Sequence, residues 1–337
     1  MKRIKFLSFF LVLSTMFMFS GCDHDTDTFD GPSLVDQFGP FVVNTDFSAS
    51  QSTVDFANGE TVFFNAAFNI NVNWVVEITG SESGSIKRIE GFSNELNASN
   101  ATWNGGTTVL PLFTEEEVTA VLTIPEMEDF FATTTIDVLS ERTFEGFLFT
   151  DFEEEFGIDA FVGNFEFEFT PDTGRDPSFP AEGDFSFRFE GTDNVVPNFF
   201  VGLVDFKSTI TGNDLLQFPT TVPEDLFFNF FIFSDGGPHG IGIIQFAVDT
   251  NDSGAFEDNM DQTFQVSPDI DLSIFEGWQQ VSYPMSDTGI SQSDLAKIVA
   301  IRVLLISDMN AQPTPPLEVG FGLDYMIFTE GGPLDLE

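Results

Sequence analysis

The sequence predicts an all-β protein made of two β-sandwiches, and three observations support this. Apolar and polar residues alternate with period two between turn signals, over 41–138 and again over 151–328, which is the pattern of half-buried strands. No stretch keeps a helical period, although 293–297 could form a single turn. The 45 Phe far outnumber the three Trp and two Tyr, and Phe is core material because it has no polar group. The length of 337 residues is enough for two domains.

The first 22 residues have the features of a secretory signal and a lipidation site. Basic residues within the first five positions precede an apolar run over 6–19, and small residues then lead to Cys22. The sequence Phe19-Ser20-Gly21-Cys22 resembles the bacterial lipoprotein lipobox, although Phe19 replaces the usual Leu. The resemblance implies a signal peptide over 1–21 and a membrane anchor through lipid on Cys22. The alternative is an uncleaved anchor, but the run is shorter than the roughly 20 residues that span a bilayer.

Residues 22–36 are expected to form an acidic tether. Aspartates alternate there with Thr and Gly, and the apolar content is too low for a core. An acidic segment directly after a lipidated cysteine resembles the surface-export signal of Bacteroidetes lipoproteins. This resemblance implies a lipid-anchored protein of the outer membrane, exposed at the cell surface. The alternative is an acidic spacer on a protein that faces the periplasm.

The charge of the chain excludes some partners. With 55 Asp+Glu and 11 Lys+Arg, the net charge is −44, so nucleic acid and anionic lipid headgroups are repelled. The simplest interpretation of this acidity is a solvated surface suited to a salty medium. Because Cys22 is the only cysteine, no intramolecular disulfide can form.

The N-terminal half is expected to contain short strands joined by tight turns. The pattern indicates a hairpin turn at Asn58-Gly59, strands over 61–68 and 72–78, a turn over 81–84 and a strand over 118–124. The stretch WVVEITGSESGSIKRIEG followed by ATWNGG is similar to the Ig-like domain of flagellar hook-capping proteins and of many secreted bacterial modules. This resemblance implies an Ig-like β-sandwich over 37–140, with Trp103 folded over its edge.

The C-terminal half alternates most clearly over 184–190, where every second residue is Phe. Strands over 226–233, 241–248 and 298–306 are apolar on both faces, which suits the middle of a sandwich. Four stretches, DFE, FNFFIFSDG, GWQQVSYPMSD and GFGLDYMIF, occur here in the order seen in galactose-binding-like jelly rolls of carbohydrate-binding modules, which they resemble. The resemblance implies a carbohydrate-binding-like jelly roll over 145–331 and sugar binding. Jelly rolls of this type also serve as inert spacers.

Two places are candidate calcium sites. Oxygen-bearing side chains at positions 1, 3 and 5 with Gly at position 6 match the first half of a calcium loop, but position 12 is Met260 rather than Glu. The loop ligands would be Asp249, Asn251 and Ser253, with Asp258 or Asp261 in place of the missing Glu. The alternative is an acidic hairpin. The jelly-roll resemblance separately implies a structural Ca²⁺ between Glu153 and Asp324, with Asp151 nearby; the alternative there is a hydrogen-bonded structural Asp324.

Sugar recognition requires directed polar groups beside an apolar or aromatic surface. The candidate ligand-binding residues are His239, Gln245, Tyr283 and Arg302, which lie on or beside strands. Trp278 is expected in the core. The scarcity of Trp and Tyr argues against strong glycan binding.

Enzymatic chemistry has little support in the sequence. Only His24 and His239 are present, and His24 lies in the tether, so a histidine-based triad would depend on one residue. No Glu-x-Asp-x-x-Glu arrangement of the laminarinase kind occurs. We therefore expect a non-catalytic surface lipoprotein whose jelly roll binds a glycan. The alternative is a structural or adhesive protein whose partners are other envelope proteins.

Overall fold

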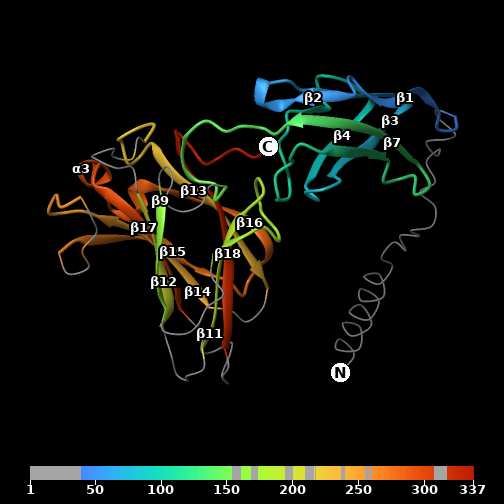
Figure 1. Ribbon diagram of the computed structural model, residues 1–337. Helices are drawn as coiled ribbons and strands as arrows, with labels where there is room; N and C mark the ends of the chain where they lie inside the picture. Colours follow the sequence, from blue (N-terminus) through green and yellow to red (C-terminus); the bar gives the residue numbers. More distant parts are fainter. Residues whose placement is uncertain are drawn as a thin grey trace, which may run out of the picture.

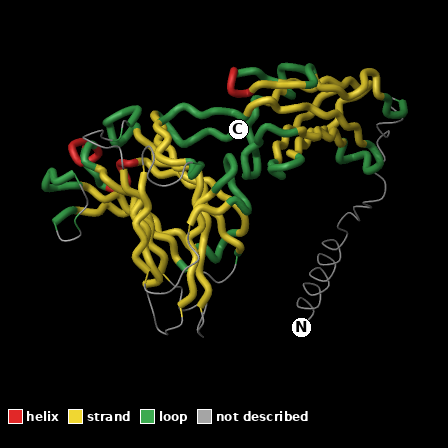
Figure 2. Tube along the Cα trace, in the orientation of Figure 1, coloured by secondary structure: helices red, strands yellow, loops and turns green. Residues whose placement is uncertain are grey.

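The computed structural model describes residues 39–153, 161–167, 174–193, 200–208, 216, 218–236, 240–254, 257, 260–306 and 317–337. This part of the chain is almost entirely β-structure, as Figures 1 and 2 show, which confirms the predicted fold class. The expected signal peptide over 1–21, the expected tether over 22–36 and Cys22 lie outside the described residues. Among the described residues, no helix is both long and apolar enough to cross a membrane.

The N-terminal half contains one seven-stranded sheet with the order β1-β3-β6-β7-β2, in which β4 and β5 also pair with β3. Its elements are β1 (Val43–Ala49), β2 (Thr53–Asp55), η1 (Phe56–Asn58), β3 (Val62–Gly80), β4 (Ile86–Leu96), β5 (Thr102–Trp103), β6 (Glu117–Thr123) and β7 (Phe131–Ser140). The core of this half lies along β3, where Trp74, Val76 and Ile78 are buried on one face as predicted.

Two expectations for this half are wrong. The strands expected over 61–68 and 72–78 form one strand, the 19-residue β3, because Ile70 continues the alternation and is buried between the exposed Asn69 and Asn71. The turn at Asn58-Gly59 does not close a hairpin. It ends the short helix η1, where Gly59 adopts a left-handed φ of 76°, and β2 pairs in parallel with β7 instead.

Trp103 belongs to the interior of this half. Its ring is fully buried between Phe56 and Phe113, with centroids 4.7 Å and 4.9 Å away, and its Nε1–H donates to the carbonyl of Gly106 at 2.9 Å. A buried indole N–H needs such an acceptor, so Trp103 has a structural role.

The C-terminal half is a jelly-roll sandwich of two facing sheets. One sheet has the order β10-β11-β18-β13-β16, with β8 beside β18, and the other has the order β15-β14-β17-β12-β9. The elements are β8 (Phe147–Thr150), β9 (Phe161–Phe167), β10 (Gly174–Asp176), β11 (Ser186–Asp193), β12 (Phe200–Ser208), β13 (Leu226–Asp235), β14 (Ile241–Val248), β15 (Gln262–Asp271), β16 (Glu276–Pro284), η2 (Met285–Thr288), α3 (Gln292–Leu295), β17 (Ile298–Ile306) and β18 (Leu317–Glu330). The strands expected in the middle of the sandwich, β13, β14 and β17, each have neighbours on both sides, so this prediction is confirmed.

Phenylalanine fills the space between the two sheets. Phe187 and Phe189 of β11 are fully buried, as the alternation over 184–190 predicts. Phe228 of β13 packs against Phe246 of the opposite sheet at a centroid distance of 5.2 Å and against Phe328 of β18 at 4.8 Å. These rings bury large apolar areas, which is the main source of stability in such a core.

A small apolar cluster joins the two halves. It consists of Leu112, Ala181, Phe231, Tyr325, Ile327 and Leu334. The backbone N–H of Leu112 donates to the carbonyl of Ala181 at 2.7 Å. The C-terminal segment returns between the halves (Figure 1), where Glu337 forms an ion pair with the nearly buried Lys87. The halves are therefore in direct contact through apolar, backbone and ionic interactions.

Candidate functional site

The outer face of the five-stranded sheet is the first candidate site. In β14, Ile244 and Phe246 belong to the core, so the residue between them, Gln245, points to the opposite face. The same alternation in β17 buries Ile301 and Val303 in the core and turns Arg302 outward. The period-two pattern of the sequence thus places both predicted residues on one face.

A single row of polar residues crosses this face. Gln265 of β15 lies opposite Gln245, Gln245 lies opposite Arg302, and Arg302 lies opposite Asp205 of β12. Asn164 of β9 occupies the next register position. The row therefore combines the predicted Gln245 and Arg302 with Gln265 and Asp205, which the sequence interpretation missed. The sequence feature that could have identified Asp205 is its position between two apolar residues, Val204 and Phe206, both of which are buried in the core.

Arg302 and Asp205 form a bidentate ion pair. The Nε of Arg302 lies 2.6 Å from Oδ1 of Asp205, and its second guanidinium nitrogen lies 2.8 Å from Oδ2. Both residues are nearly buried, at 9% and 3% exposure. Two parallel hydrogen bonds fix the plane of the guanidinium, so Arg302 is held in one orientation within the row.

Apolar side chains flank the polar row on one side. In the register of the sheet, Ile243, Leu304 and Leu203 form the next row toward one end. The next row toward the other end contains Ala247 and Ala300, which are fully buried, and Thr263 of β15. No aromatic side chain faces outward from these rows among the residues whose side chains the structure describes. The face thus offers hydrogen-bonding groups beside one apolar strip, in which Ile243 and Leu304 are partly exposed.

The other two predicted ligand-binding residues do not join this row. Tyr283 lies in β16 of the opposite sheet, where its ring packs against the core 6.4 Å from the ring of Phe230. His239 lies outside the described residues.

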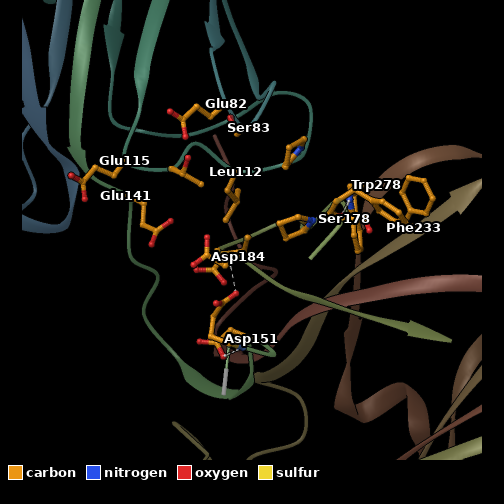
Figure 3. A pocket seen from close by; sticks show the side chains of 18 residues that line it. Glu82, Ser83, Leu112, Glu115, Glu141, Asp151, Ser178, Asp184, Phe233 and Trp278 are labelled. Carbon is orange, nitrogen blue, oxygen red and sulfur yellow. Dashed lines mark hydrogen bonds between the residues drawn. The ribbon is translucent and has the colours of Figure 1, made fainter. Parts of the chain in front are cut away.

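The second candidate site is an acidic cavity of about 810 Å³ between the two halves, shown in Figure 3. The N-terminal half and the following linker contribute Glu82, Glu115 and Glu141, which lie above and to one side of the cavity. The remaining carboxylates come from the jelly roll: Asp151, Glu153, Glu182 and Asp184. Partly exposed aromatic side chains, Phe179, Phe233 and Trp278, line the opposite side.

Asp324 is fully buried beneath this cavity, and its side chain is hydrogen-bonded to the backbone of residues that line the cavity. Its carboxylate accepts hydrogen bonds from the backbone N–H groups of Ala181 (2.8 Å), Glu182 (3.1 Å) and Tyr325 (2.8 Å). Burial raises the pKa of Asp324 well above its usual value, although these donors oppose the shift. Glu153 similarly accepts from the N–H groups of Asp184 and Phe185 at 2.7 Å and 2.8 Å.

Two glutamates that line the cavity, Glu182 and Glu141, have raised pKa values. Burial, together with the negative charges of Glu141 and Asp324, raises the pKa of Glu182 to about 9. The pKa of Glu141 is also raised, first by burial and then by neighbouring carboxylates. Oε2 of Glu182 is buried and has no hydrogen-bond partner among the described residues. A buried acceptor without a donor is uncommon in native structures.

In the loop proposed as a calcium site, backbone N–H groups of the loop donate hydrogen bonds to the side chain of its first residue, Asp249. The carboxylate of Asp249 accepts from the N–H groups of Asn251 (3.1 Å), Ser253 (3.1 Å) and Gly254 (2.6 Å). Burial raises the pKa of Asp249, but these donors outweigh it and leave the pKa below its usual value. Lys297 forms an ion pair with Asp252 of the same loop at 2.8 Å.

Both oxygens of Asp249 thus accept backbone hydrogen bonds, and the ammonium of Lys297 neutralises one carboxylate of the loop. Asp258 lies outside the described residues. Among the described residues, neither this loop nor the pair Glu153 and Asp324 belongs to a group of three or more His, Cys, Asp or Glu arranged to hold a metal ion. Calcium therefore stays a prediction from the sequence.

Comparison with known proteins identifies structural neighbours only. No family model matches the chain, and no curated protein matches its sequence. A structure described as showing the promiscuous specificity of carbohydrate-binding modules from the β-sandwich superfamily has 14% identity and a TM-score of 0.38, covering 86% of this chain and 98% of its own.

Two further neighbours come from Clostridium thermocellum. The family 11 carbohydrate-binding module, in complex with a β-1,3-1,4-mixed-linked tetrasaccharide, has 14% identity and a TM-score of 0.36, covering 56% of this chain and 98% of its own. The family 30 module of a cellulosomal cellulase has 13% identity and a TM-score of 0.36, covering 55% and 98%. The structural neighbours of this chain are thus carbohydrate-binding modules with a β-sandwich fold.

Proposed function

We propose that the outer face of the five-stranded sheet binds a polysaccharide or similar glycan without catalysis. The observation that supports this most directly is the row Gln265, Gln245, Arg302 and Asp205, which crosses four neighbouring strands beside an apolar strip. Glutamine amides both donate and accept hydrogen bonds, and a fixed guanidinium donates, so the row matches the hydroxyl groups of a sugar. The partly exposed Ile243 and Leu304 match the C–H face of a sugar ring.

The way the acid in this row is used supports binding without catalysis at this face. Glycoside hydrolysis requires two carboxyl groups, one on each side of the scissile bond. Asp205 is the only carboxyl group among the side chains described in the row, and both of its oxygens are bound by Arg302. Because Arg302 engages both oxygens, Asp205 does not present a carboxyl group to a bound sugar.

The proposal includes the position of the protein in the cell. The sequence patterns around Cys22 and over 22–36 support a lipid anchor in the outer membrane with the chain exposed to the medium. Residues 37–140 then act as an Ig-like spacer that holds the jelly roll away from the membrane. An outward-facing glycan receptor needs this arrangement, because polysaccharides do not pass freely through an outer membrane.

Affinity electrophoresis tests the proposal. The protein without residues 1–21 is run through gels that contain algal or plant polysaccharides, and at least one of these should retard it. Gln245→Ala should reduce the retardation, whereas Gln279→Ala should not, since Gln279 is exposed on β16 of the opposite sheet. Failure of every glycan to retard the protein would favour the alternative, a structural or adhesive protein that contacts envelope proteins. Release of reducing ends from a retained polymer would show an enzyme instead.

A further inference from the structure

The apolar strip beside the polar row extends beyond a single row of side chains. Ile241 lies opposite Ile306 at the next outward-facing positions of β14 and β17, beyond Ile243 and Leu304. Ile241, Ile243 and Leu304 are partly exposed, whereas Ile306 is nearly buried. Neighbouring strands lie about 5 Å apart, and alternate residues of one strand lie about 7 Å apart. The three partly exposed side chains are therefore neighbours, and we call them the aliphatic patch.

The aliphatic patch is branched rather than flat. Ile and Leu side chains stand roughly perpendicular to a sheet and end in separate methyl groups. The flat face of a sugar ring is matched best by an aromatic ring, and no aromatic side chain faces outward from these rows among the side chains that the structure describes. Branched aliphatic side chains favour a compact apolar group instead, such as a methyl group that fits between them.

The charged groups beside the patch disfavour an anionic ligand. Among the described side chains of the polar row and the patch, Arg302 is the only cation, and Asp205 binds its guanidinium through two hydrogen bonds. Asp271 of β15 lies opposite Ile241, so a second carboxylate borders the far end of the patch. Its Oδ1 accepts a hydrogen bond from the hydroxyl of Ser273 at 2.6 Å. A uronate or sulfate group at this face would therefore be repelled by two carboxylates.

The polar row lies close enough to the patch for one or two sugar units to contact both. Gln245 and Ile243 both face outward from β14 and are two residues apart, a separation of about 7 Å. Gln265, which lies opposite Gln245, is exposed. The hydroxyl groups of a sugar can thus reach the glutamine amides while a substituent on the same or the next sugar reaches the patch.

From these observations we infer that the preferred glycan is uncharged and carries methyl groups, as acetylated sugars and 6-deoxy sugars do. The inference rests on the proposed glycan binding and specifies the class of glycan. Hydroxyl groups of the glycan bind the polar row, and its methyl group is buried against Ile243 and Leu304. Burial of one methyl group is expected to tighten binding about fourfold.

Matched pairs of ligands test this inference on the protein without residues 1–21. Affinity electrophoresis compares an O-acetylated glucomannan with the same polymer after alkaline deacetylation. NMR titration compares L-fucose with L-galactose, which differs from it only by a hydroxyl group on C6. In at least one pair the methyl-bearing member should bind about fourfold more tightly or better. A preference in the first pair alone identifies an acetyl group, and one in the second pair alone identifies a 6-deoxy sugar. Oxidation of C6 in the glucomannan to a carboxylate should weaken binding.

Matched variants locate the preference on the patch. Leu304→Ala should reduce the preference for the methyl-bearing member, whereas Leu139→Ala, the same change at a position of β7 that is 52% exposed, should leave it unchanged. Circular dichroism shows whether each variant folds, and Ile243→Ala replaces Leu304→Ala if that variant does not. The comparison of ligand pairs on the unmodified protein does not depend on any variant.

The outcomes separate this inference from the proposed function. Equal binding of both members in every pair, or binding of neither member while another glycan is retained, would overturn the inference and leave glycan binding in place. Tighter binding of the oxidised glucomannan, or an undiminished preference in the folded patch variants, would also overturn it. Failure of every glycan to bind would overturn both the inference and the proposed function.

Discussion

The buried ion pair between Arg302 and Asp205 allows a quantitative prediction. The two side chains are 11% and 4% exposed and are joined by two short hydrogen bonds. Replacing Asp205 by Ala removes the bidentate carboxylate from a buried guanidinium, and breaking a buried ion pair typically costs about 3–5 kcal/mol of unfolding free energy. Arg302→Met leaves a buried carboxylate and should cost a similar amount. The double variant should lose much less than the sum, because no charge is then left unpaired.

Urea unfolding of the four proteins in this cycle, followed by circular dichroism, gives the coupling energy directly. We expect a coupling of about 2–3 kcal/mol. The matched control is the exposed pair Arg88 and Glu90, which are 53% and 70% exposed with 3.7 Å between Nε and Oε2. That pair should show a coupling of about 0–1 kcal/mol. A coupling between Arg302 and Asp205 as small as that of the control would refute the reasoning, and with it the fixed orientation of Arg302.

Three further predictions follow from the core, the acidic cavity and the candidate metal sites. Phe228→Ala should destabilise the protein by about 3–5 kcal/mol in urea unfolding, because Phe228 is fully buried, whereas Phe92→Ala, at a position 65% exposed, should change it by less than about 0.5 kcal/mol. Glu182 is ionised in the unfolded chain above its ordinary pKa of 4.5 but stays protonated in the folded protein up to about pH 9, so folding binds a proton in this window and stability falls as the pH rises through it. Glu182→Gln should therefore raise the melting temperature more at pH 8 than at pH 5, and an equal effect at both would contradict the assignment. If the predicted Ca²⁺ binds, EDTA lowers the melting temperature, and an unchanged midpoint would remove calcium from the account.

Local sequence patterns were sufficient for much of the fold. The alternation over 184–190 and the apolar runs of β13, β14 and β17 predict strands, because the side-chain period of a strand is fixed by backbone geometry. They also placed Gln245 and Arg302 on strands, and the register of β14 against β17 shows that the two residues share a face. The continuous strand β3 was missed, because two asparagines at Asn69 and Asn71 look like a turn when the buried Ile70 between them is not weighed.

The parts of the candidate sites that the sequence did not predict depend on contacts between residues far apart in the chain. Asp205 and Arg302 are 97 positions apart, and only the register of β12 against β17 shows that they pair. The acidic cavity depends on how the two halves dock, as the hydrogen bond from Leu112 to Ala181 illustrates, and no local pattern encodes that contact. With 55 acidic residues in the chain, Glu182 could not be distinguished by composition or spacing.

The most direct test of the proposed glycan face is NMR with the polysaccharide fragment that retards the protein best. The side-chain amide signals of Gln245 and Gln265 lie in the polar row, and that of Gln279 lies on the opposite sheet. Binding at the proposed face should shift the signals of Gln245 and Gln265 and leave that of Gln279 unchanged. Shifts confined to Gln279, or no shift of Gln245 at saturating glycan, would contradict the account.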